Sequence, residues 1–275
     1  MVLPALLALV LAVSAVQVIR LTARSRREAA FYETARQAYV QGPAGPEREE
    51  PAAGAAETES GAAGQDAAET EGGAAAPDAA EAPAAPALQV DFPALQAAGR
   101  DVRAWISVPG TGISYPVVQG TDNKTYERRD YTGAYAWSGS IFLDCRCEAD
   151  FAGRSAILYG HNLQDGSMFS QLERFQEEAF LAEHPVFYIA TPDALRTYEI
   201  FAVLVTDAAG PAYTTEFADD AAYAAYLAAL LEDAVLTAGD APAAQDPIAL
   251  LSTCTNRGRT ERLVAAGRLT DLAPS

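Results

Sequence analysis

The sequence predicts a mainly β fold for residues 89–275, a closed barrel or sandwich of about 185 residues. Three observations support this prediction. After residue 88, aromatic and β-branched residues become frequent, turn signals such as Pro109-Gly110 and Asp165-Gly166 recur at short intervals, and the runs between these turns have the length of strands. The chain before this domain is predicted to contain a membrane helix, a second helix and a linker.

The first element is an uncharged, largely apolar run over residues 2–19. As a helix it would reach roughly 27 Å, close to the thickness of a bilayer core. We therefore predict a transmembrane anchor over residues 1–22. A cleaved signal peptide is the alternative, which the length of the run and the lack of basic residues before it disfavour.

Two further segments separate this run from the β domain. Residues 23–41 are predicted to form a juxtamembrane helix, because Phe31, Ala35 and Ala38 recur at helical spacing. Residues 42–88 are mainly Ala, Gly, Pro and Glu, with ten acidic residues against one basic between 43 and 87. Such a segment buries too little apolar surface to offset its ordering entropy, so we predict a disordered acidic linker.

The charge of the chain excludes one class of partner. The 275 residues carry a formal net charge of −18, whereas binding to phosphates requires clustered Lys and Arg. We therefore expect no nucleic-acid partner.

Within the β domain, the sequence predicts many short strands with a few helical insertions. Strands are expected over residues 115–119, 140–143, 156–159, 186–190, 197–205, 248–252 and 262–269. Helices are expected over residues 92–98, 170–173, 177–183 and, most clearly, 219–232.

Few side chains are available for thiol chemistry, because the chain has three cysteines and two histidines. Cys254 follows the strand predicted at 248–252, where the scaffold fixes the backbone and leaves the sulfur open. A buried structural cysteine is the alternative. His161 follows the strand at 156–159 and opens a polar loop, whereas His184 precedes a proline and is interpreted as a turn residue.

Arg262 begins the last apolar run, shortly after Cys254. A guanidinium beside a thiol favours the thiolate and offers donors to the oxyanion of a tetrahedral intermediate. Arg257 and Arg259 are closer in sequence and compete for this role. On spacing alone, a solvated loop charge is the better interpretation of any one of the three.

Three segments that carry these residues resemble the sortase family, and class B within it, and the similarity spans residues 92–269. They are WISVPGTGISYPVVQGTDNKTYERRDYTGAYAWSGSIFLD, YGHNLQDGSMFSQL and LLSTCTNRGRTERLVAAGRL. The family's Leu-Ser-Thr-Cys motif matches residues 251–254 and its Tyr-Gly-His motif matches residues 159–161. The arginine that opens the family's final strand matches Arg262 rather than Arg257 or Arg259.

The resemblance implies a closed eight-stranded β-barrel with flanking helices, including an additional helix at 219–232 before the final strands. It also implies a cysteine transpeptidase with Cys254, His161 and Arg262 as catalytic residues. Such an enzyme cleaves a C-terminal sorting signal of a surface protein, in several class B members of the Asn-Pro-x-Thr type. It then transfers the acyl group to an amine of a cell-wall precursor or a pilin, and no cofactor or metal is expected.

The substrate groove and the orientation of the anchor are further expectations. Asn123, Ser252 and Thr253 are predicted to bind substrate, with hydrogen bonding at turns and strand ends as an alternative of at least equal weight. Arginines 20, 24, 26 and 27 follow the apolar run, which by the positive-inside rule favours a cytoplasmic domain. The predicted catalytic domain favours the opposite orientation, a single-pass protein of the cell membrane with its catalytic domain extracellular.

Cys145 and Cys147 stand where the family usually carries an aromatic and a small polar residue. Residues two apart in a strand point to the same face, so the thiols lie near each other. A disulfide over so short a loop is strained, and the chain lacks the further soft ligands of a metal site. We interpret the pair as structurally incidental.

Two other functions compete with transfer to an amine. A cysteine hydrolase would release the acyl group to water with the same catalytic residues. An inert binding module at the cell surface would use none of them.

Overall fold

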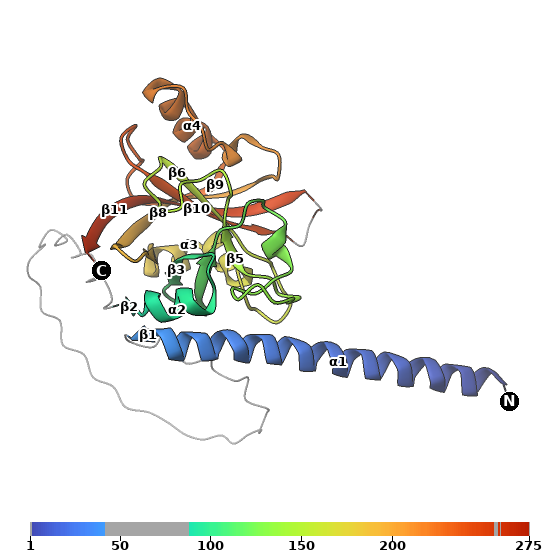
Figure 1. The fold of residues 1–275 in the computed structure, drawn as a ribbon. Coiled ribbons are helices and arrows are strands. Elements are labelled where there is room, and N and C mark those ends of the chain that lie inside the picture. Colours follow the sequence, from blue (N-terminus) through green and yellow to red (C-terminus); the bar gives the residue numbers. More distant parts are fainter. Residues whose placement is uncertain (1, 42–87, 256–257, 259, 275) are drawn as a thin grey trace, which may run out of the picture.

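The computed structural model describes residues 2–41, 88–255, 258 and 260–274 (Figure 1). The acidic linker predicted for residues 42–88 lies outside the described residues except for Leu88. The competing arginines at 257 and 259 lie outside them as well.

Eight strands close into a barrel, as predicted. They follow the order β11-β10-β6-β5-β4-β3-β7-β8, and β8 pairs with β11 to close the sheet. A further strand, β9, pairs with β8, and the short strands β1 and β2 pair with each other. The bounds are β1 Val40–Gln41, β2 Gln89–Val90, β3 Val102–Val108, β4 Ile113–Val118, β5 Ile141–Leu143, β6 Ser155–Tyr159, β7 Val186–Ala190, β8 Ala194–Asp207, β9 Ala234–Thr237, β10 Ile248–Cys254 and β11 Glu261–Pro274.

Helices flank this barrel, with α1 and α4 on opposite sides of it (Figure 1). The α-helices are α1 Val2–Tyr39, α2 Phe92–Ala98, α3 Glu178–Glu183 and α4 Asp220–Glu232. Three 3-10 helices, η1 Thr125–Glu127, η2 Ser170–Gln176 and η3 Pro211–Tyr213, lie in the connections. The helix predicted before the final strands is confirmed as α4, which begins at an Asp219 cap whose carboxylate accepts from the Ala222 amide.

The barrel wall is apolar on both faces where β6, β10 and β11 run side by side. Leu251 and Leu263 belong to the cluster that fills the interior. Ile157, Leu250 and Val264 belong to a second cluster, which they share with residues of α4 such as Tyr223 and Leu227. Because side chains alternate along a strand, this division shows which residues of β10 face α4 and which face the interior.

The C-terminal part of α1 packs against the barrel. Tyr32 and Ala35 are buried, and the Tyr32 hydroxyl donates to the carbonyl of Gly139 at 2.6 Å. The Glu28 carboxylate accepts from the amides of Trp137 and Ser138 at 3.0 and 2.8 Å. This helix therefore holds the segment that lies between η1 and β5.

The predicted transmembrane anchor, and with it the single-pass localisation in the cell membrane, is corrected by the structure. Among the described residues, no helix has a stretch that is both long and apolar enough to cross a bilayer. The apolar run does not end at a helix boundary, because α1 continues through Arg20, Arg24, Arg26 and Arg27 as one helix to Tyr39.

Candidate active site

Cys254 and Arg262 lie opposite each other at the ends of neighbouring strands. Cys254 is the last residue of β10, and it is the direct partner of Arg262 in the antiparallel β10–β11 pair. Directly opposed residues in such a pair project from the same face of the sheet, with Cβ atoms about 5 Å apart. The strand register therefore places the two side chains next to each other on one face, and the Arg262 guanidinium donates from Nη1 to the Glu261 carbonyl at 3.0 Å.

The face from which they project is the outer one, towards α4. Leu250 packs with α4, and Ser252 and Cys254 follow it at a spacing of two along β10. Cys254 is partly exposed, whereas Ser252 is buried and its hydroxyl lies 2.8 Å from the Tyr213 hydroxyl. Cys254 therefore lies at the accessible end of β10, whereas Ser252, two residues earlier on the same face, is buried.

His161 begins the segment after β6, which runs parallel to β10. The histidine is partly exposed, and its Nε2 lies 2.8 Å from the carbonyl oxygen of Glu127. A carbonyl only accepts, so Nε2 carries the hydrogen of this bond and Nδ1 remains for another partner. Gly160 has no room for a side chain, because a Cβ would lie 2.5 Å from Ile141 and 2.6 Å from Phe169.

Hydrogen bonds tie the residues around His161 to the end of β10. The Gly160 amide donates to the Ser252 carbonyl at 3.1 Å, and the Thr253 hydroxyl donates to the Gly160 carbonyl at 2.8 Å. On the other side of the histidine, the side-chain nitrogen of Asn162 donates to the Cys254 carbonyl at 2.9 Å. The structure therefore brings the His161 segment, Cys254 and Arg262 together at one end of the barrel.

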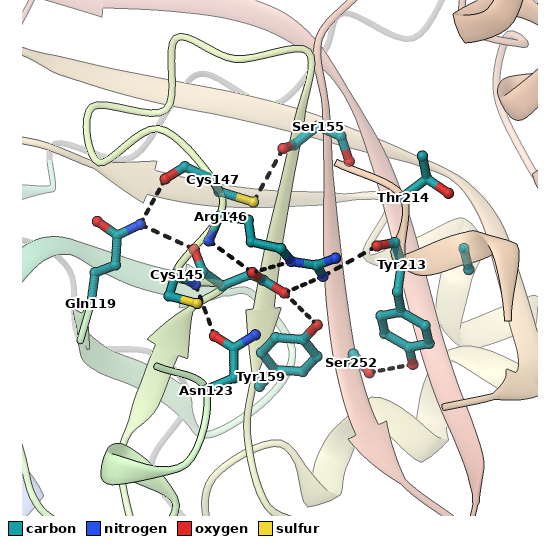
Figure 2. A network of polar contacts seen from close by, with 12 residues as sticks. Gln119, Asn123, Cys145, Arg146, Cys147, Ser155, Tyr159, Tyr213, Thr214 and Ser252 are labelled. Atoms are coloured by element: carbon teal, nitrogen blue, oxygen red, sulfur yellow. Dashed lines mark hydrogen bonds and ion pairs between the residues drawn. The ribbon is translucent and has the colours of Figure 1, made fainter. Parts of the chain in front are cut away.

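The three residues predicted to bind substrate all have partners within the chain. Ser252 contacts Tyr213, and Thr253 is buried with its hydroxyl on Gly160, on the face opposite to Cys254. Asn123 lies beside the turn after β5, where its side-chain oxygen accepts from the Cys145 amide at 2.8 Å (Figure 2). Substrate contact by these side chains stays a prediction.

Tyr213 is a neighbour of the site that sequence reasoning missed. Its hydroxyl lies 2.8 Å from that of Ser252, two residues before Cys254, and burial raises its pKa. It stacks on Tyr159 with ring centroids 6.0 Å apart and an angle of 18° between the planes. The sequence offers little signal for this role, because Tyr213 lies 41 residues before Cys254 in a connection without a motif.

Cys145 and Cys147 are both free thiols in the turn after β5. Burial raises the pKa of Cys147 to about 11, and its sulfur lies 3.4 Å from the Ser155 carbonyl. Such a thiol is protonated at neutral pH, and the thiolate is the reactive form. Cys147 is therefore unsuited to act as a nucleophile at neutral pH, although it is partly exposed, as Cys254 is.

A closed β-barrel that presents a thiol, a guanidinium and a histidine segment at adjoining strand ends has the arrangement of a cysteine-dependent acyl-transfer enzyme. Comparisons with known proteins identify the family of the chain. The family model described as Sortase domain matches residues 106–270.

Relatives and solved structures agree with this match. Sortase B of Listeria monocytogenes is 34% identical over 177 residues, which cover 64% of this chain and 72% of the relative. The crystal structure of Clostridium perfringens sortase B superposes with a TM-score of 0.62 at 29% identity, covering 65% of this chain and 99% of that chain. The Staphylococcus aureus sortase B–substrate complex has a TM-score of 0.62 at 28% identity and covers 66% and 84% of the two chains.

The chain belongs to the sortase family, and within it to class B. Sortases are cysteine transpeptidases, so the chain is an enzyme of that kind.

Proposed function

We propose that this transpeptidase cleaves a C-terminal sorting signal of surface proteins through an acyl-thioester on Cys254. The acyl group then passes to an amine of a cell-wall precursor or a pilin. The observation that carries this proposal is the direct pairing of Cys254 with Arg262 beside the His161 segment. A similar protein, the sortase B of Staphylococcus aureus, has been solved as a complex with substrate.

In the first half of the reaction, the Cys254 thiolate attacks the carbonyl carbon of the scissile peptide bond. A carbon–sulfur bond forms, the carbon–nitrogen bond breaks, and His161 donates a proton to the leaving amine. The product is a thioester on Cys254 and a released C-terminal peptide.

In the second half, the acceptor amine attacks the thioester carbon. A new carbon–nitrogen bond forms, the carbon–sulfur bond breaks, and His161 takes a proton from the amine. The amine is thus the chemical group that distinguishes transfer from hydrolysis, in which water takes the same place.

In both halves, negative charge develops on the carbonyl oxygen. Arg262 projects from the same face as Cys254, and its guanidinium offers N–H donors to that oxygen. A preorganised donor of this kind contributes roughly 3–4 kcal/mol to transition-state stabilisation. Arg262 is therefore proposed as the oxyanion-stabilising residue.

The proposal is tested by mixing the protein with a panel of fluorescent Asn-Pro-x-Thr peptides, with and without triglycine. The expected result is a product in which triglycine is joined to the threonine carbonyl, with Cys254→Ala and His161→Ala inactive. Mass spectrometry of the reaction should also detect the acyl-enzyme on the peptide that contains Cys254. Hydrolysis alone in the presence of triglycine would instead assign a hydrolase, and no turnover of any peptide would overturn the proposed function.

A further inference from the structure

An ion pair with a buried carboxylate lies in the turn after β5. The Asp144 side chain is fully buried, whereas the Arg146 side chain is about half exposed. The guanidinium binds both carboxylate oxygens, with Nε 2.9 Å from Oδ1 and Nη2 2.7 Å from Oδ2. Two parallel bonds of this kind hold the guanidinium in one plane and one direction.

Arg146 also reaches the connection between β8 and α4. Its Nη2 donates to the Tyr213 carbonyl at 3.3 Å, which Figure 2 shows as a contact between the two segments. Arg146 and Tyr213 are 67 residues apart in the sequence, so this contact fixes one part of the fold to another. The carboxylate orients the arginine, and the arginine in turn holds the backbone of Tyr213.

Tyr159 provides a second path between the same two segments. Its hydroxyl donates to Asp144 Oδ2 at 2.8 Å, and its ring stacks on Tyr213 (Figure 2). The Tyr213 hydroxyl in turn forms a hydrogen bond with the hydroxyl of Ser252, two residues before Cys254. Tyr159 itself lies two residues before His161. The ion pair therefore connects to Tyr213 from both its backbone and its ring.

We propose that Asp144 and Arg146 are positioning residues, which hold Tyr213 against the Cys254–Arg262 end of the barrel so that it forms one wall of the donor-peptide site. The inference rests on the proposed function, because it assumes that the donor lies beside Cys254. Neither residue touches the reacting atoms. Their loss should weaken binding of the donor and leave the chemistry at the sulfur intact.

The main test uses Arg146→Gln and Arg146→Lys, since the half-exposed arginine is easier to replace than the buried aspartate. Glutamine loses the charge, and lysine keeps it but cannot bind two carboxylate oxygens and a carbonyl with one nitrogen at the same geometry. We expect KM for the best donor peptide to rise about tenfold in Arg146→Gln and less in Arg146→Lys, the size that one or two hydrogen bonds account for. Both kcat and the rate of Cys254 alkylation by iodoacetamide should stay within about twofold of the wild type.

Asp220→Asn is the matched control. It removes another Arg–Asp pair, between Arg154 and the exposed Asp220 at the start of α4, which has no contact with the Asp144–Arg146 pair or with Tyr213 among the described interactions. This variant should keep the KM of the wild type. A parallel measurement of donor-peptide Kd by fluorescence anisotropy, with each variant in a Cys254→Ala background, reports binding without turnover.

The outcomes separate the two proposals. An Arg146→Gln variant that melts like the wild type but has unchanged KM and Kd overturns the positioning role. A parallel fall of kcat, alkylation rate and folded fraction overturns it too, because that pattern indicates a purely structural pair. If Cys254→Ala binds the peptide and the wild type does not turn it over, the proposed function fails while the Kd values still decide the role of the pair. A wild type that neither binds nor turns over any donor overturns both proposals.

Discussion

Cys254 and Arg262 are direct cross-strand partners at the open end of the β10–β11 pair. Their separation of eight residues in sequence is bridged by the connection between the two strands, whose base is held by the Thr255 amide and the Glu261 carbonyl at 3.2 Å. The relative position of thiol and guanidinium is therefore set by strand register. A register is rigid, because a slip of one residue would turn every side chain of the strand to the other face.

Replacement of Arg262 by Ala should lower kcat roughly 100- to 1000-fold, because it removes the proposed oxyanion donor. Arg262→Lys keeps the charge but loses the fork of donors, so we expect an intermediate loss. Steady-state kinetics of the transfer to triglycine measure both effects.

Arg268→Lys is the control for this prediction, since Arg268 lies on the same strand and pairs with Glu199 at 2.8 Å, away from the site. It should change thermal stability more than kcat. If Arg262→Ala keeps more than half of the wild-type kcat, Arg262 is not the oxyanion donor.

Cys254 and Cys147 should differ in their reaction with iodoacetamide. Cys254 is expected to react at neutral pH, whereas the surrounding protein raises the pKa of the partly buried Cys147 to about 11. Because only the thiolate reacts, the raised pKa means that labelling of Cys147 in the folded protein increases only as the pH approaches 11. Peptide mass mapping across a pH series measures each site, with urea-unfolded protein as the reference in which Cys147 is accessible. Labelling of Cys147 at pH 7 at the rate of Cys254 would contradict the burial of its sulfur.

Much of the fold could be predicted from the sequence because local signals and tertiary structure agree there. The helix at 92–98 and the strand at 186–190 occur with the predicted bounds, as α2 and β7. β3 was not predicted, because Val102–Val108 is buried at five of its seven positions and so lacks the alternation that marks a half-exposed strand. The predicted membrane span was wrong, since the apolar run was judged without the charged part of the helix into which it continues.

The surroundings of the site were less accessible to sequence reasoning. Cys254, His161 and Arg262 stand in recognisable motifs at strand ends, so their grouping could be expected from family resemblance. Tyr213 and the Asp144–Arg146 pair depend on contacts between segments about 70 residues apart, and no local pattern specifies which tyrosine meets which arginine. Asp144 was visible only as an acidic residue near two cysteines.

The Asp144–Arg146 pair should make the protein sensitive to acid. Burial alone would raise the pKa of Asp144, but hydrogen bonds from Arg146, Asn123 and Tyr159 outweigh it and lower the pKa to about 2. The folded-state pKa is thus below the unfolded value near 4, so the stabilisation is complete above pH 4 and is lost as the pH falls towards 2. A shift of this size corresponds to roughly 2–3 kcal/mol at neutral pH.

Urea unfolding of the wild type and Asp144→Asn between pH 2 and 6 measures this contribution. The difference in unfolding free energy should shrink as the pH falls through the window between 4 and 2. Asp220→Asn, at the exposed pair, should differ little from the wild type at every pH, as expected of a surface ion pair. A difference for Asp144→Asn that stays constant over the whole range would show that the carboxylate is not stabilised in its charged form.

Asn162 connects the Cys254 end of β10 to a carboxylate, and this makes an exchange of amide and carboxylate informative. Its side-chain nitrogen donates to the Cys254 carbonyl at 2.9 Å and to Glu173 Oε1 at 2.7 Å. Asn162→Ala loses both bonds, and we expect kcat/KM to fall about tenfold. Asn162→Asp places a carboxylate against two hydrogen-bond acceptors, so kcat/KM should fall further than in Asn162→Ala. Gln164→Glu makes the same change from amide to acid at an exposed position of the same loop, and it should leave kcat/KM nearly unchanged. Because Glu173→Gln supplies a donor to the new carboxylate, the double variant Asn162→Asp/Glu173→Gln should recover part of the activity that Asn162→Asp loses. Equal activity of the single and double variants would mean that Glu173 does not act on the Cys254 strand end through Asn162.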